Sequence, residues 1–449
     1  MAFITDKQTL DDLNIFGRHG KQSVFSLFNF TYTKGGADLL ERMFRNPMNE
    51  ASAINKRSRL IRFFQTARLS FPFKSEWFDA IEPYLENTDT RSRLSHADNN
   101  LERKFRNLIG SDTDYQLIAK GVFGVYSILY TFRQFVESME KSSAGSSWDE
   151  EMVVIKTLLS EPDFHKLYQQ KLPKKLSFEE SAEYDKLFRF IHRNTITRLL
   201  SYIYSLDVYI SVASVAERYG FVFPSALDAN DHRVELVNVY HPHLEKPRAN
   251  SIRIDPQGNV VFLTGANMAG KSTFMKSLGI ALYLAHMGFP VPAERMEFSV
   301  RDGLLTTINL ADNLNMGFSH FYAEVLRVKK IAREVNSGKN MFVIFDELFR
   351  GTNVKDACEA TIAIVGAFAE RTNSMFIIST HIMEAGEVLR DQFRNIQFLF
   401  LPTKMEGTKP LYTYQLEKGI TSDRHGMIII QNEKIIDILR NGKKKTITA

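Results

Sequence analysis

The amino-acid sequence predicts a multidomain protein of mixed class, in which an all-helical region precedes an α/β domain with a mixed sheet. Its 449 residues exceed what one hydrophobic core usually organises, so two or three domains are expected. From about Asp38 to Gly220, apolar residues recur at the helical spacings of three and four. After Pro224, short β-rich runs alternate with helical stretches, which is typical of an α/β domain. We therefore expect domains of residues 1–234 and 235–449.

Composition and charge narrow the class of protein. Hydrophobic residues make up 44% of the chain and charged residues 24%, as in ordinary folded proteins. The net charge of +5 is small for this length, so it neither requires nor excludes a polyanionic partner. The single cysteine, Cys358, cannot form an intramolecular disulfide, which is compatible with a reducing cytosol. We expect no signal peptide and no membrane segment, and hence a cytoplasmic protein.

One long helix is predicted at the end of the helical region. Ser177-Phe-Glu-Glu180 has the capping-box pattern that starts a helix, and an apolar stripe continues from there to Gly220 without a proline. At 1.5 Å per residue such a helix would be about 60 Å long and would act as a strut. The alternative is two ordinary helices with a turn near residues 193–194. Residues 142–147 and 172–175 are expected to be breaks ahead of this helix.

The β-rich runs after Pro224 predict the strands of the second domain. Helical stretches lie between most of them, and this alternation indicates a mixed sheet. The expected strands are Ser251–Ile254, Val260–Thr264, Phe342–Phe345, Met375–Ser379, Ile396–Leu401 and Leu411–Leu416.

A glycine-rich segment after the strand at residues 260–264 has the pattern of a phosphate-binding loop. Residues 265–272 read G-A-N-M-A-G-K-S, and a helical stretch follows them. The two glycines allow backbone N–H groups to curl around phosphates at a helix N-terminus. Lys271 is expected to neutralise the β and γ oxygens of ATP, and Ser272 to hold Mg²⁺. The predicted nucleotide-binding residues are Gly265, Ala266, Asn267, Met268, Ala269, Gly270, Lys271, Ser272 and Thr273.

Two further motifs follow buried strands. In phosphate-loop enzymes a strand-end carboxylate reaches the Mg²⁺ shell, and a following glutamate can deprotonate the water that attacks the γ-phosphate. Asp346 is therefore the predicted metal residue and Glu347 the predicted catalytic base. His381 follows the strand at residues 375–379, where it can sense the γ-phosphate as a second catalytic residue. A purely structural role is the alternative for this histidine.

The order of these motifs describes a Mg²⁺-dependent ATP hydrolase of the ABC type, in which two nucleotides are usually sandwiched between two subunits. We therefore expect a homodimer formed through the ATPase domains. A small-molecule kinase is less favoured, because an Asp-Glu pair suits the activation of water rather than of an acceptor hydroxyl. The ATPase subunit of a transporter is disfavoured because the sequence has no L-S-G-G-Q stretch.

The sequence resembles the MutS family of DNA mismatch repair ATPases. Residues 264–273 are similar to the family's T-G-P-N-M-x-G-K-S-T loop, residues 346–352 to its D-E-I-G-R-G-T segment and residues 379–381 to its A-T-H. Residues 317–324 resemble its signature G-x-S-T-F-x-x-E, which implies that Ser319 reaches the γ-phosphate of the other subunit. From the residues alone, Ser319 would be a helix N-cap. The helical half resembles the family's core and lever segments, so the resemblance covers most of the chain.

The sequence also departs from the family pattern. Its first residues resemble the family's core domain, so we expect no counterpart of the N-terminal mismatch-reading domain, and the helical arm is short for a full DNA clamp. Ala266 and Phe349 replace the family's proline and glycine, and no aromatic residue lies near Arg248, where the family stacks adenine. We therefore expect DNA binding that depends on structure rather than on mismatch reading.

Basic clusters are the local signal for nucleic acid. They can neutralise phosphates without reading sequence, and the alternative is that they are solvated faces, because acidic residues are interleaved. The main hypothesis is a dimeric ATPase whose ATP-driven closure moves helical levers to bind DNA without sequence specificity, which would associate it with the nucleoid. The alternative is a nucleotide-gated adaptor that engages a protein partner without DNA contact. The clusters are Lys56, Arg57, Arg59, Arg62 and Arg68; Lys171, Lys174 and Lys175; and residues 443–445.

Overall fold

The chain folds into two compact units. A computed structural model describes residues 2–17, 22–94, 111–143, 147–308, 320–406, 409–421 and 433–441. The first unit combines Met1–Leu27, Phe44–Ser58 and Val215–Ala449, and the second combines Phe28–Met43 and Arg59–Ser214. The domain boundary between residues 234 and 235 follows the change in sequence composition and stays a prediction. Contacts group two early segments with the C-terminal part of the chain.

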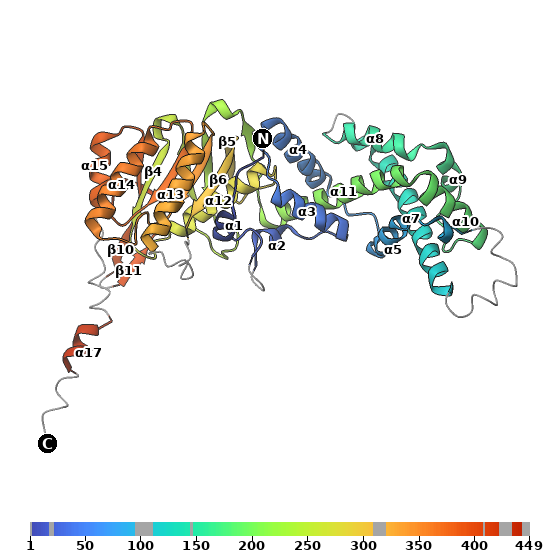
Figure 1. Cartoon of the computed structure of the whole chain (residues 1–449), viewed down its shortest axis with the longest axis horizontal. Coiled ribbons are helices and arrows are strands. Elements are labelled where there is room, and N and C mark those ends of the chain that lie inside the picture. The colour runs from blue at the N-terminus through green and yellow to red at the C-terminus, as the bar shows by residue number, and fades with distance from the viewer. Residues whose placement is uncertain are drawn as a thin grey trace, which may run out of the picture. The chain divides into compact units, whose positions relative to one another are not determined.

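The region from Asp38 to Gly220 is predicted to be helical. Among its described residues, the regular elements are all helices, joined by loops (Figure 1). Within the second unit, α5 packs closely against α7, because a Cβ atom on Gly121 of α7 would lie 2.3 Å from Cβ of Tyr84 on α5. The helices of this region are α3 (Lys34–Arg45), α4 (Ala51–Ala67), α5 (Ser75–Glu86), η1 (Thr90–Ser92), α7 (Ser111–Ser143), α8 (Asp149–Leu159), η4 (Pro162–Phe164), α9 (His165–Tyr168), α10 (Phe178–Asp185), η5 (Lys186–Ile191) and α11 (Arg193–Tyr219).

The prediction of one continuous helix from Ser177 to Gly220 is wrong. The capping box is present, since Glu180 N donates to Oγ of Ser177 over 3.2 Å and Ser177 N donates to the Glu180 carboxylate over 2.8 Å. After α10, however, the chain forms the π-helical turn η5, and His192 N donates to the carbonyl of Leu187 over 2.8 Å, five residues back. His192 then leaves helical geometry and α11 begins at the next residue. The structure therefore contains separate helices, as in the alternative with a turn near residues 193–194.

A fully buried ion pair lies at the π-helical turn. The Arg189 guanidinium donates two hydrogen bonds of 2.6 Å to the Asp185 carboxylate, and both side chains are 0% exposed. The same carboxylate accepts from Tyr84 Oη over 3.0 Å and from Leu94 N over 3.0 Å, and Arg189 also donates to Oγ of Ser92. These partners offset the cost of removing both charges from water. Burial, followed by the Asp185 charge, raises the pKa of Tyr84.

Helix α11 is long and apolar enough to cross a membrane by length and composition, and it is the one described helix of which this is true. Of its most apolar 18-residue stretch, 72% is buried inside the structure. Such burial is what a core helix of a folded domain requires, and Asp207 within it accepts hydrogen bonds from Tyr32 N and Thr33 N.

The first unit contains a mixed six-stranded sheet in the order β12-β9-β4-β8-β7-β6, in which β12 alone runs antiparallel to its neighbour. A second, four-stranded sheet has the order β1-β5-β2-β3, and β10 and β11 form a hairpin. The strands are β1 (Ser225–Leu227), β2 (Val234–Val239), β3 (Asn250–Ile254), β4 (Val260–Gly265), β5 (Arg295–Ser299), β6 (Gly303–Thr307), β7 (Met341–Phe345), β8 (Met375–Ser379), β9 (Ile396–Leu401), β10 (Thr403–Glu406), β11 (Lys409–Tyr412) and β12 (Glu417–Lys418).

Five of the six predicted strands are confirmed as β3, β4, β7, β8 and β9. The prediction of a strand at Leu411–Leu416 is wrong in its second half, because β11 ends at Tyr412 and Tyr414 has a φ of 56°. A left-handed residue cannot continue a strand, so the chain turns before β12 begins. The expectation of a mixed sheet is confirmed.

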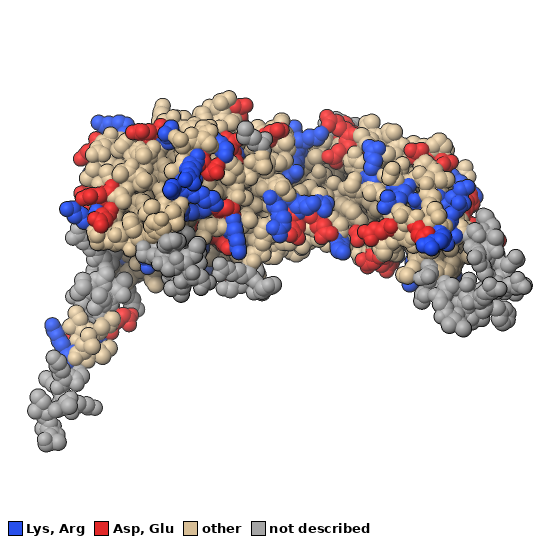
Figure 2. Space-filling view, viewed as in Figure 1, with Lys and Arg blue, Asp and Glu red and all other residues tan. Residues whose placement is uncertain are grey.

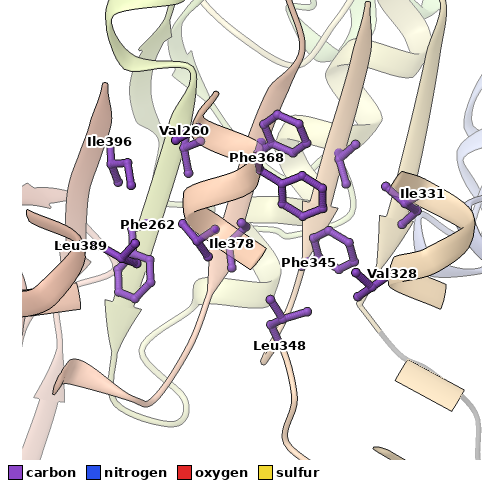
Figure 3. Packing of buried hydrophobic residues seen from close by; sticks show 14 of the residues in the cluster. Val260, Phe262, Val328, Ile331, Phe345, Leu348, Phe368, Ile378, Leu389 and Ile396 are labelled. Carbon is purple, nitrogen blue, oxygen red and sulfur yellow. The ribbon is translucent and has the colours of Figure 1, made fainter. Parts of the chain in front are cut away.

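Helices α12 (Lys271–His286), α13 (His320–Asn336), α14 (Val354–Ala369) and α15 (Met383–Gln392) pack against strands of this unit. The other described helices after Gly220 are η6 (Ala229–Asp231), η7 (Pro256–Gly258) and α17 (Ile435–Asn441). Figure 3 shows the core, in which Phe345 of β7 stacks on Phe368 of α14 and Ile331 of α13 faces the same cluster. Burying each such side chain stabilises the fold by about 1.5–3 kcal/mol.

The N-terminal segment extends the edge of the six-stranded sheet, which explains its place in the first unit. Ile4 forms a parallel bridge with Gly303 of β6. In α1 (Lys7–Asp12), the Asp12 carboxylate accepts hydrogen bonds from Thr306 Oγ1 over 2.7 Å and Ile308 N over 2.8 Å. The next helix along the chain is α2 (Val24–Phe28). The sheet therefore depends on residues that lie almost 300 positions apart.

Candidate active site

Three predicted motifs meet at one edge of the six-stranded sheet. Strands β4, β8 and β7 are adjacent and parallel, so their carboxyl ends lie at the same edge. The glycine-rich loop follows β4, His381 follows β8, and Asp346 and Glu347 follow β7. Ligands of open α/β sheets bind at this kind of edge. The sheet order thus brings together residues that are more than 100 positions apart in the sequence.

The glycine-rich loop curls tightly between β4 and α12. Gly265 and Gly270 have φ values of 147° and 101°, which side chains rarely allow, and Met268 also has a positive φ of 69°. Gly270 is the N-cap of α12, which begins at Lys271, so the first N–H groups of that helix face the loop. Such an N-terminus favours an anion such as phosphate.

The Lys271 side chain lies inside this loop. Its Nζ atom donates hydrogen bonds to the carbonyl oxygens of Gly265 over 2.8 Å and Ala266 over 3.2 Å. Burial lowers the pKa of this amine, whereas the charges of Asp346 and Glu347 act in the opposite direction. The ammonium group is thus held over the loop, where it can bind an anion.

The Asp346 carboxylate joins the loop to the neighbouring strand. Its Oδ2 atom accepts a hydrogen bond of 2.5 Å from Oγ of Ser272, and its Oδ1 atom accepts one from Oγ of Ser379. The Asp346 backbone N donates to the carbonyl of Thr307 on the other side. A serine hydroxyl and a carboxylate at this distance form a donor set that suits a hard cation such as Mg²⁺.

Glu347 lies between two basic side chains. Its Oε1 atom is 2.6 Å from Nε2 of His381, and its Oε2 atom accepts a 2.9 Å hydrogen bond from Arg350. The hydrogen bond to His381 lowers the pKa of Glu347, although partial burial opposes this effect. The carboxylate is therefore charged at neutral pH. Its backbone has a φ of 54°, a left-handed conformation that costs about 1–2 kcal/mol outside glycine.

A pocket of about 500 Å³ opens beside these groups. Seven of the nine predicted loop residues line it, as do Glu347 and Arg248. The structure adds Tyr414, whose ring lies so close that a Cβ on Gly270 would be 3.0 Å from its Cδ1 atom. The family resemblance instead pointed to the chain near Arg248 for such an aromatic residue. Tyr414 lies 166 positions away, and no local pattern marks it.

The structure does not reach every predicted site residue. Ser319, within the predicted signature segment, lies outside the described residues, and so do residues 144–146 of the serine-rich break at 142–147. The basic residues 443–445 also lie outside them. The roles predicted for Ser319, for the loop residues and for Asp346, Glu347 and His381 stay predictions.

Comparison with known families finds two matching models. Residues 8–213 match MutS domain III, and residues 261–446 match MutS domain V. The second match begins within β4 and includes the glycine-rich loop and both strand-end motifs. The first covers most of the helical region.

Individual relatives agree with these models. The chain is 29% identical over 253 residues to a DNA mismatch repair protein MutS of Lysinibacillus sphaericus. The matched stretch covers 55% of the chain and 29% of that relative. The chain is 31% identical over 239 residues to MutS of Leuconostoc citreum, covering 52% and 27%, and 26% identical over 290 residues to MSH3 of Vanderwaltozyma polyspora, covering 61% and 28%. The matches thus span less than a third of the length of these relatives. Because two of the family's domain models match in order along the chain, the chain belongs to the MutS family.

Proposed function

We propose that the protein is a MutS-like, Mg²⁺-dependent ATP hydrolase with an ABC-type phosphate-loop domain. One observation carries the proposal: Lys271, the Ser272–Asp346 pair and the Glu347–His381 pair converge at one sheet edge, beside a pocket of about 500 Å³. Relatives that carry the name DNA mismatch repair protein support the same assignment.

The residues at this edge fit ATP and Mg²⁺. Loop N–H groups and the Lys271 ammonium would bind the β- and γ-phosphates, while Ser272 and Asp346 would hold the cation. When bound, Mg²⁺ supplies positive charge that stabilises the charge developing on the phosphate oxygens. The Tyr414 ring lines the pocket and offers an apolar face against which the nucleotide's aromatic base can stack.

Glu347 would orient the attacking water and accept its proton. Its charged carboxylate can act as a general base, and the contact with Nε2 of His381 holds that carboxylate in one orientation. Hydrolysis then needs no acceptor molecule, which distinguishes this arrangement from a kinase. Ser319 would complete the site of a second subunit, so that ATP binding favours a homodimer.

ATP-driven closure of the dimer would move the helices of the helical region, which act as levers, and so bring them onto DNA. Arg59, Arg62 and Arg68 lie on exposed positions of α4 and the loop after it, where they can contact phosphates. Figure 2, however, shows acidic and basic side chains interleaved over the face in view, rather than one basic stripe. Because of this interleaving, a second candidate function, a nucleotide-gated adaptor for a protein partner, must be tested against DNA binding.

Lys271→Ala is expected to abolish measurable ATP hydrolysis. The change removes the buried ammonium group that would bind the phosphates. Phosphate release from the purified chain with ATP and Mg²⁺ measures the effect. Lys355→Ala, on the exposed start of α14, serves as the control and should hydrolyse ATP at the wild-type rate. Equal rates for Lys271→Ala and wild type would exclude the proposed ATP hydrolase.

DNA binding by the Glu347→Gln variant separates the two candidate functions. This variant should bind ATP and hydrolyse it slowly, which keeps the ATP-bound state populated. We expect ATP-dependent binding to homoduplex, mismatched or four-way-junction DNA, with an affinity that falls steeply between two salt concentrations because phosphate contacts release counterions. The Lys271→Ala protein is the control for nucleotide dependence. Absence of binding at low salt, with ATP bound and dimers formed, would favour the adaptor.

A further inference from the structure

The loop after β7 has an uncommon backbone conformation. Both Glu347 and Phe349 lie in the left-handed region, with φ values of 54° and 62°. Neither glutamate nor phenylalanine adopts this conformation readily, because its side chain approaches the following carbonyl. Strained residues of this kind persist when surrounding contacts hold them, and they gather at functional sites. Contacts must therefore hold the loop in this shape.

Ser379 of β8 holds the first part of the loop. Its Oγ atom accepts a hydrogen bond of 3.1 Å from Glu347 N, and its carbonyl accepts one of 3.4 Å from Leu348 N. Figure 3 shows Leu348 at this end of β7, next to Phe345 in the core. These contacts fix the backbone at Glu347 and Leu348. They do not hold Phe349, the second left-handed residue, so another element must do so.

Helix α13 holds the second part. The Phe349 side chain is 4% exposed, and its ring centroid lies 5.9 Å from that of Phe321, at an interplanar angle of 59°. Gly351 N donates to the Glu324 carboxylate over 3.4 Å. Phe321 and Glu324 are three residues apart, so they lie on the same face of α13. That face contacts the loop both at its strained residue and two residues beyond.

We infer that Phe349 is a positioning residue for Glu347: by packing on Phe321, it holds the left-handed turn that aims the Glu347 carboxylate into the pocket. The inference rests on the proposed function, since it assigns Glu347 the role of base. Phe349 is buried and is not among the residues that line the pocket. It links the loop that carries the base to α13, so that a displacement of α13 moves the base.

A pair of substitutions tests this inference through kcat and KM. Phe349→Gly keeps the left-handed backbone accessible but removes the ring, and it should lower kcat for ATP about tenfold or more, because a misplacement of about 1 Å is enough for such losses. KM should stay within about twofold, since the phosphate loop is untouched. Phe349→Leu, which keeps an apolar side chain, should lose less. A wild-type kcat in Phe349→Gly would overturn the inference.

Phe321→Ala provides an independent arm. If the two rings act together, Phe321→Ala should cause the same loss of kcat as Phe349→Gly, and the double variant should lose no more than either. Additive losses would overturn the coupling. Phe132→Leu, which removes a buried ring packed on Phe73 in the helical unit, is the matched control and should lower the melting temperature while kcat is retained.

Hydrogen exchange separates failure of this inference from failure of the proposed function. If the wild-type protein shows no ATP hydrolysis that depends on Lys271, the proposed ATP hydrolase is excluded. The packing of Phe349 on Phe321 can then still be tested by hydrogen exchange. Phe321→Ala should then raise the exchange rates of the amides of Glu347, Leu348 and Gly351, which the structure places in hydrogen bonds. Unchanged exchange at these three amides would overturn the inference whatever the turnover.

Discussion

Glu347→Gln is expected to lower kcat for ATP hydrolysis by about 10²–10⁴-fold, the usual contribution of a positioned general base. Glutamine has nearly the same shape and can keep the contact with His381, but it cannot accept a proton from water. Affinity for ATP should change little, because the phosphate loop and Lys271 are unaltered. Single-turnover hydrolysis together with equilibrium nucleotide binding measures the two quantities separately.

The control for this variant is Glu384→Gln, an exposed glutamate at the start of α15, which should retain the wild-type rate. The pKa of Glu347 lies below its ordinary value of 4.5, chiefly through the hydrogen bond to His381. The base is therefore deprotonated at neutral pH, and activity lost through its protonation should appear only below pH 4.5. A loss of less than about threefold in Glu347→Gln would remove this residue from the catalytic role.

Arg189→Met is expected to destabilise the helical unit by about 3–5 kcal/mol, because it leaves the Asp185 carboxylate buried without its cation. Methionine keeps much of the volume of the arginine stem, so the effect reports the charge rather than a cavity. Both tryptophans, Trp77 and Trp148, belong to this unit, so tryptophan fluorescence during urea unfolding follows its transition.

An exposed ion pair of the same unit is the control for Arg189→Met. Lys166 contacts Glu183 over 2.8 Å, but the two side chains are 60% and 51% exposed. Solvent screens such a pair, so Lys166→Ala should change the free energy of unfolding by about 1 kcal/mol or less. Similar small losses in both variants would show that the Arg189–Asp185 pair does not stabilise the π-helical turn.

Patterns within a few residues predicted much of the fold. Helical periodicity identified the helical region, apolar runs identified five strands, and the capping box at Ser177 started α10 as expected. The glycine-rich loop and the two strand-end motifs were also visible, because each depends on neighbours in the chain. These signals failed where a distant partner intervened. The helix predicted through His192 is interrupted where Arg189 turns to a buried carboxylate that also binds Tyr84 and Leu94.

The sequence by itself determined the class of each half, the family to which the motifs point and the residue types of the candidate site. Only the tertiary structure decided that Tyr414 lies against Gly270, that Asp12 binds the end of β6 and that Phe349 packs on α13 in a left-handed conformation. The reason is physical: backbone propensity and side-chain periodicity act over a few residues, whereas sheet order brings together residues hundreds of positions apart. Such contacts arise from the packing of whole elements, which no local pattern records.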